Sequence, residues 1–104
     1  MSETVYIETS IIVYLTARPS NNLIFMANLE ATRQWWETCR ARFTLYISQV
    51  VLDEVARVYG LDYLLTWNFW HTANAQIQKK LAQISLDAGY ELPTICTPYE
   101  LMGE

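Results

Sequence analysis

Short apolar segments alternate along the chain with longer segments in which apolar residues recur every three or four positions. The short segments are rich in β-branched and aromatic residues, which favour strands, and the third is nearly unbroken, as in the interior of a parallel sheet. The longer segments have the period of helices. The predicted strands are Thr4 to Ile7, Phe43 to Ile47, Leu61 to Thr66 and Pro93 to Cys96, and the predicted helices are Ile11 to Leu15, Leu23 to Arg42, Gln49 to Tyr59, His71 to Ala88 and Tyr99 to Met102.

Alternating strands and helices predict an α/β fold with a short parallel sheet and right-handed crossovers. With 104 residues, the chain is expected to form one domain spanning residues 1–104. Gly60 and Gly89 stand where glycines end helices. Thr97 and Glu100 have the spacing of a capping box, which predicts a terminal helical turn.

The two long helices each carry a predicted apolar face. The faces consist of Ile24, Ala27, Ala31, Trp35 and Cys39 on the first helix, and of Ala73, Ile77, Leu81, Ile84 and Ala88 on the second. Trp36 lies off its stripe and is a candidate for contact with another molecule. Arg33, Arg40 and Arg42 form either a solvated face or a local patch that meets phosphates.

Composition narrows the function classes. The chain is 52% hydrophobic and has a net charge of −4, which argues against the broad basic surface of a nucleic-acid-binding domain. Cys39 and Cys96 form no metal or redox motif, so reduced thiols are expected. The start of the chain lacks the pattern of a signal peptide, and no apolar run is long enough to span a bilayer, so a cytoplasmic protein without a membrane partner is expected.

Three polar residues follow predicted strands or lie near their ends: Glu8, Glu54 and Asn68. Ligands of open α/β sheets bind outside the carboxyl ends of the strands. Carboxylate and amide oxygens are ligands of hard cations, so these residues are a candidate site for Mg²⁺ or Mn²⁺. The alternative is that they are solvated residues at strand ends. Thr9 or Ser10 is expected to cap the helix that follows Glu8.

Four segments carry a resemblance to a known family. Val5 to Ile12 resembles the opening motif of PIN-domain proteins, Ser48 to Val55 resembles their second motif, Leu64 to Phe69 resembles their last motif, and Pro93 to Glu104 resembles the end of a VapC-toxin-like branch. The resemblance implies a three-layer PIN-like α/β fold and the activity of a metal-dependent ribonuclease. Many proteins of this family are toxins of toxin–antitoxin pairs. It also implies that Glu8, Glu54 and Asn68 are catalytic metal ligands, and that Ser10 is the small hydroxyl residue beside the first acid.

The chain departs from this family in its third acid. No segment between Glu54 and Leu61 resembles the helical motif that carries the acid, so the chain looks like a PIN domain truncated by an internal deletion. Asp53 is no replacement, because neighbouring residues on a helix point about 100° apart. Asp62 begins a strand and is expected at the opposite end of the sheet. The family's first acid is normally Asp, and a displacement of about 1 Å at Glu8 can lower a rate roughly 100-fold.

Three hypotheses follow from the incomplete set of acids. The first is a degenerate VapC-type ribonuclease with weak or no activity, so whether the chain is an enzyme stays open. The second is a non-catalytic module that self-assembles or binds an antitoxin-like protein. The third is a nuclease whose missing acid comes from a second subunit. Loss of helices would uncover apolar surface, which predicts a homo-oligomer with interface residues among Trp35, Trp36, Trp67 and Trp70.

Overall fold

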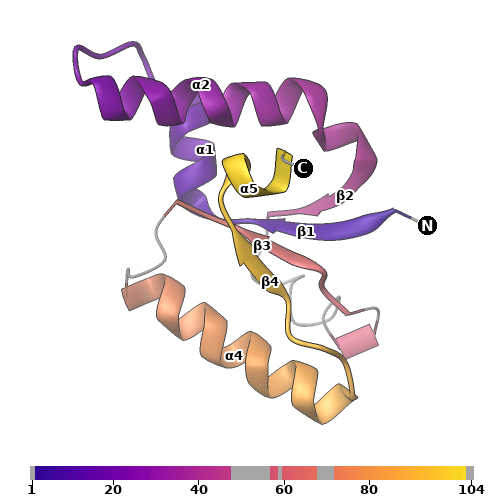
Figure 1. The fold of residues 1–104 in the computed structure, drawn as a ribbon. Helices are drawn as coiled ribbons and strands as arrows, with labels where there is room; N and C mark the ends of the chain where they lie inside the picture. The colour runs from indigo at the N-terminus through magenta and orange to yellow at the C-terminus, as the bar shows by residue number, and fades with distance from the viewer. Residues whose placement is uncertain (1, 48–56, 59, 68–71, 103–104) are drawn as a thin grey trace.

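The computed structural model describes residues 2–47, 57–58, 60–67 and 72–102. Within these ranges the protein has an α/β fold with one parallel sheet (Figure 1). The sheet consists of β1 (Glu3–Ile7), β2 (Phe43–Tyr46), β3 (Tyr63–Leu65) and β4 (Thr94–Cys96). The strands lie in the order β2-β1-β3-β4, and every neighbouring pair is parallel. The predicted fold class is therefore confirmed.

Helices cover both faces of the sheet. One face carries α1 (Thr9–Thr16), α2 (Leu23–Thr38) and α5 (Pro98–Met102), and the other carries α4 (Thr72–Ala88) (Figure 1). The arrangement has three layers, as predicted. Because successive residues of a strand point to opposite faces, Val5 and Ile7 belong to one core cluster and Tyr6 belongs to the other.

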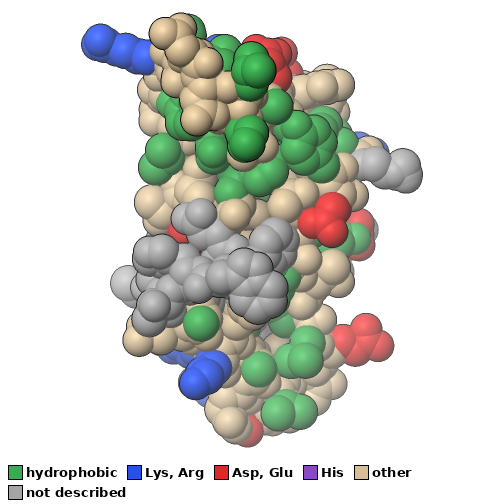
Figure 2. All heavy atoms as spheres, turned by 60° about the vertical axis from the view of Figure 1, so that its left-hand side comes forward, with side chains coloured by type: hydrophobic (Ala, Val, Ile, Leu, Met, Phe, Trp, Pro, Cys, Tyr) green, Lys and Arg blue, Asp and Glu red, His purple; other side chains and the backbone are tan. Residues whose placement is uncertain are grey.

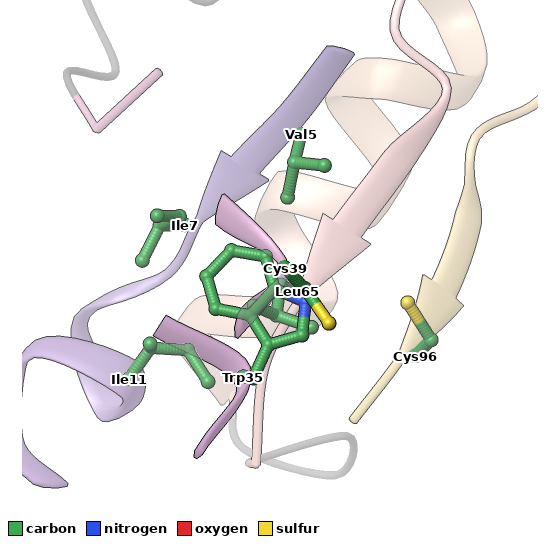
Figure 3. Close-up of a cluster of buried hydrophobic side chains, with 7 residues drawn as sticks. All are labelled: Val5, Ile7, Ile11, Trp35, Cys39, Leu65 and Cys96. Atoms are coloured by element: carbon green, nitrogen blue, oxygen red, sulfur yellow. The ribbon is translucent and has the colours of Figure 1, made fainter. Parts of the chain in front are cut away.

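The larger core cluster lies between the sheet and the α1–α2 layer. Trp35 of α2 is fully buried there against β1 and β3, as Figure 3 shows. The cluster consists of Val5, Ile7, Ile11, Trp35, Cys39, Leu65 and Cys96. Cys39 and Cys96 are buried free thiols, in agreement with the expectation from the sequence. On the opposite face Leu81 and Ile84 of α4 pack with Tyr6 and Leu64.

The predicted stripe of α2 is only partly correct. Ala31, Trp35 and Cys39 are buried, but Ile24 is 75% exposed and Ala27 is exposed. The reason is that the first turns of α2 extend beyond the sheet, so their apolar side chains have no strand beneath them (Figure 1). The helix also ends earlier than predicted, and a 3-10 turn at Arg40–Arg42 leads into β2.

Several helix ends follow the predicted local chemistry. Gly60 and Gly89 have φ angles of 75° and 80°, the left-handed conformation that favours glycine. The backbone N–H of Thr97 donates to Glu100 Oε1 at 2.9 Å, and the N–H of Glu100 donates to Thr97 Oγ1 at 3.4 Å, so the capping box is confirmed.

Two further predictions can be compared with the structure only where residues are described. The helix predicted from Gln49 to Tyr59 lies outside them except for residues 57–58, which are helical. In the part of the chain that is described, no helix has the length and apolar character needed to cross a membrane.

Candidate functional site

The order of the strands creates a switch point between β1 and β3. From β1 the chain moves to β2 on one side, and it later returns to β3 on the other side. In open parallel sheets, ligands bind at such a point, outside the carboxyl ends of the strands. Glu8 follows β1 and Thr66 follows β3, and the backbone N–H of Glu8 donates to Leu65 O at 3.0 Å. Glu8, the first predicted ligand, therefore lies at the edge where open parallel sheets commonly bind ligands.

The Glu8 carboxylate is fixed by three hydrogen bonds to one oxygen. Its Oε1 accepts from the backbone N–H of Ser10 at 3.2 Å, from Ser10 Oγ at 2.6 Å and from Thr66 Oγ1 at 2.7 Å. Glu8 itself is the N-cap of α1, with extended backbone angles, so the prediction that Thr9 or Ser10 caps this helix is wrong. Hydrogen bonds to an ionised carboxylate are among the stronger ones in proteins.

The second carboxylate oxygen of Glu8, Oε2, differs from Oε1 in its hydrogen bonding. Glu8 Oε2 accepts no hydrogen bond from any residue that the structure describes. Ser10 and Thr66 are buried, whereas Glu8 is only half-buried. The hydrogen bonds that the described residues donate to this carboxylate therefore all end on Oε1.

Trp67 connects this edge of the sheet to the helical layer above it. Its backbone N–H donates to Ser10 Oγ at 2.9 Å, and its indole Nε1 donates to Thr32 Oγ1 on α2 at 2.8 Å. The ring packs edge-on against Tyr14 and Tyr99, with centroid distances of 5.8 and 5.5 Å. The first and last sequence motifs are thus joined through Ser10, Thr66 and Trp67.

The other two predicted ligands, Glu54 and Asn68, lie outside the described residues, as do Asp53 and His71. The structure places Asp62 at the amino edge of the sheet, where its Oδ2 accepts from the backbone N–H of Thr4 at 2.8 Å. This confirms that Asp62 is far from Glu8.

A hard cation at this edge of the sheet would need oxygen ligands. Glu8 offers a carboxylate oxygen, and Mg²⁺ is often bound through one or two carboxylates and water. The described residues contain no cluster of three His, Cys, Asp or Glu side chains that could hold a metal. Glu8 could therefore supply one ligand of a metal site. The remaining ligands would have to come from other residues, such as Glu54 and Asn68.

Cys39 and Cys96 are both buried free cysteines in the core. Burial, with the Glu100 carboxylate nearby, raises the pKa of the Cys96 thiol to about 12. A thiol with this pKa stays protonated at neutral pH and is a weak nucleophile.

The arginines of the helical layer are partly engaged within the protein. Arg33 Nη2 donates to Ala17 O at 3.3 Å. Arg40 lies 4.7 Å from the centre of the Trp36 ring, and Arg42 lies 5.5 Å from the centre of the Phe43 ring. Trp36 is half-buried against the larger core cluster, so part of its surface already has a packing role.

Sequence reasoning identified Glu8 and Ser10 but missed Thr66 and Thr32 as parts of this network. A hydroxyl residue directly after a buried strand was a usable signal for Thr66. No local signal marked Thr32, because its partner Trp67 lies 35 positions away in sequence.

Comparison with models of protein families, with curated proteins and with solved structures found no match.

Proposed function

We propose that this protein is a degenerate PIN-domain protein of the VapC-toxin type, derived from a metal-dependent ribonuclease and retaining weak or no nuclease activity. The observation that supports this most directly is the position of Glu8. It follows β1 at the switch point of a parallel sheet and accepts hydrogen bonds from Ser10 and Thr66. The segments that resemble the first and last motifs of the family therefore meet at one edge of the sheet.

In this proposal Glu8, Glu54 and Asn68 hold Mg²⁺ or Mn²⁺. Such an ion, when bound, activates water and stabilises the charge on a phosphodiester. The chain's own contribution is orientation: Ser10 and Thr66 hold Glu8 Oε1 and leave Oε2 for the ion. The absence of the family's third acid from the sequence is the reason to expect low activity.

RNA cleavage tests this proposal. The purified protein is incubated with RNA and Mn²⁺ or Mg²⁺, and the parent is compared with Glu8→Gln and Glu54→Gln. Glu30→Gln is a matched control, because Glu30 is an exposed acid on α2 and takes no part in the hydrogen bonds around Glu8. Metal-dependent cleavage that is lost in both site variants and kept in the control supports a residual nuclease. Cleavage that neither site variant reduces contradicts the assignment of the site.

A second candidate is a non-catalytic module that forms a homo-oligomer or binds an antitoxin-like protein. The supporting observation is apolar surface on the α1–α2 layer. Val13 is 53% exposed, Leu23 is 85% exposed and Ile24 is 75% exposed. Figure 2 shows hydrophobic side chains gathered over the upper half of one face, where these helices lie. Absence of cleavage by the parent protein, together with assembly in solution, would favour this function.

A further inference from the structure

We propose that Thr32 and Trp67 are positioning residues for the cation ligand Glu8, acting through Ser10. This inference rests on the proposed metal site. It goes further by assigning a role to a side chain on α2, which contributes no ligand to that site. The relevant contacts form two links that share Trp67: the indole of Trp67 binds Thr32, and its backbone N–H binds Ser10.

The first link has a fixed direction. Thr32 Oγ1 donates its single proton to Asn28 O at 2.6 Å. It can therefore only accept the hydrogen bond from Trp67 Nε1, at 2.8 Å. The indole N–H can only donate, so the two groups are matched. Thr32 is fully buried. Thr38 on the same helix makes the equivalent bond to Gln34 O, also at 2.6 Å, but it is exposed.

The second link sets the direction of the Ser10 hydroxyl. The backbone N–H of Trp67 donates to Ser10 Oγ at 2.9 Å and so occupies one of its lone pairs. The hydroxyl proton of Ser10 is then directed to Glu8 Oε1 at 2.6 Å. A displacement of Trp67 would weaken this bond, which is the shortest of the three that hold Glu8 Oε1, and would loosen the carboxylate, although the bonds from Thr66 Oγ1 and the Ser10 N–H would remain. Side chains that orient metal ligands from behind commonly change metal affinity by about 10-fold to 100-fold when they are replaced.

Packing alone does not account for the indole. The ring of Trp67 lies against Tyr14 and Tyr99, and a phenylalanine ring could keep part of that packing. The indole differs by its N–H group, which is bonded to Thr32. The proposal therefore predicts that removal of this one hydrogen bond changes cation binding even where the ring remains.

The test compares two substitutions at Thr32. Thr32→Val keeps the shape of the side chain and removes the hydroxyl, whereas Thr32→Ser keeps the hydroxyl and removes a methyl group. Binding of Mn²⁺ is measured by electron paramagnetic resonance and unfolding by circular dichroism. Both substitutions are expected to lower the melting temperature, because one leaves an indole N–H unpaired and the other leaves a small void. Affinity for Mn²⁺ is expected to fall about 10-fold in Thr32→Val and to stay near the parent value in Thr32→Ser.

A double substitution tests the coupling. Trp67→Phe alone should weaken Mn²⁺ binding at least as much as Thr32→Val, since it removes the same hydrogen bond and part of the ring. Adding Thr32→Val to Trp67→Phe should cause little further loss, because the hydrogen bond is already absent. The indole proton resonance of Trp67 should shift in Thr32→Val and keep its position in Thr32→Ser. Affinity that follows the melting temperature across the variants, or an indole resonance unchanged in Thr32→Val, would overturn the inference.

The variant Glu8→Gln separates this inference from the proposed function. If Glu8→Gln abolishes Mn²⁺ binding but Thr32→Val binds as the parent does, the metal site stands and the positioning role is wrong. If the parent itself shows no Mn²⁺ binding that depends on Glu8, the proposed metal site fails, and the positioning role fails with it.

Discussion

Thr66 Oγ1 donates a 2.7 Å hydrogen bond to Glu8 Oε1, although 58 positions separate the two residues in sequence. The bond joins the residue after β3 to the residue after β1, and these strands are neighbours in the sheet. Thr66 is fully buried, so its hydroxyl needs partners within the protein. The contact therefore links the stability of the sheet edge to the orientation of the candidate ligand.

Replacement of Thr66 by Val should destabilise the protein. The substitution keeps the shape of the side chain and removes the donor to Glu8 Oε1, and hydrogen bonds to charged groups contribute about 1.5–3 kcal/mol. Because Glu8 is half-buried and partly solvated, the lower part of this range is expected. The free energy of unfolding in urea measures the effect. Thr94→Val on β4, where Thr94 is exposed, is the matched control and should change stability by less than about 0.5 kcal/mol.

The two glycines with left-handed backbones should differ in their tolerance of alanine. A Cβ at Gly89 would have no atom within 4 Å, so Gly89→Ala should cost only the backbone strain, about 1 kcal/mol. A Cβ at Gly60 would lie 3.2 Å from Cδ1 of the Tyr90 ring. Gly60→Ala should therefore cost more than Gly89→Ala in urea unfolding. Equal costs for the two variants would show that the Tyr90 ring moves aside freely.

The alternation of residues explains why the fold was predictable. In β1, Val5 and Ile7 face one core cluster and Tyr6 faces the other, so a strand apolar on both faces indicates helices on both sides. The helix-ending glycines and the capping box at Thr97 could be predicted from the sequence, because each depends only on residues a few positions apart. The burial of Ile24 was mispredicted because helical period does not report whether a sheet lies beneath that turn.

The candidate site was predictable only in part. Glu8 stood out because it directly follows a predicted strand, and open parallel sheets bind ligands outside the carboxyl ends of their strands. Its partners could not be identified from local pattern, because the bonds to Thr66 and between Trp67 and Thr32 join residues that are 58 and 35 positions apart. Such pairings depend on the order of strands and on how α2 packs, which local periodicity does not encode.

The Cys96 thiol predicts a loss of stability at alkaline pH. Burial raises its pKa from the ordinary value of 9.0 to about 12. Between these pH values the unfolded chain releases a proton that the folded protein retains, so unfolding becomes more favourable as the pH rises. The contribution is fully present below pH 9 and is lost as the pH approaches 12. Cys96→Ala should flatten this part of the dependence of unfolding free energy on pH.

A control variant is needed to separate the effect of thiol titration on stability from the effect of lost packing. Ile95→Val on β4 removes a methyl group from the neighbouring half-buried residue and leaves the thiol in place. It should lower stability by about 0.5–1.5 kcal/mol at every pH, without changing the alkaline slope. A slope that is the same in the parent and in Cys96→Ala would show that the Cys96 thiol does not contribute to it.

Exposed apolar residues on α1 and α2 predict self-association. A charged side chain introduced among them should weaken it. Leu23 and Ile24 are 85% and 75% exposed at the start of α2, and Val13 on α1 is 53% exposed. If this surface forms the interface of a homo-oligomer, Ile24→Glu should shift the protein toward the monomer at micromolar concentration, because a buried unpaired carboxylate is costly. Light scattering after gel filtration measures the mass. Leu86→Glu is the control, since Leu86 is 71% exposed on α4, on the other side of the sheet. A parent that is already monomeric, or equal masses for the parent and Ile24→Glu, would contradict this location of the interface.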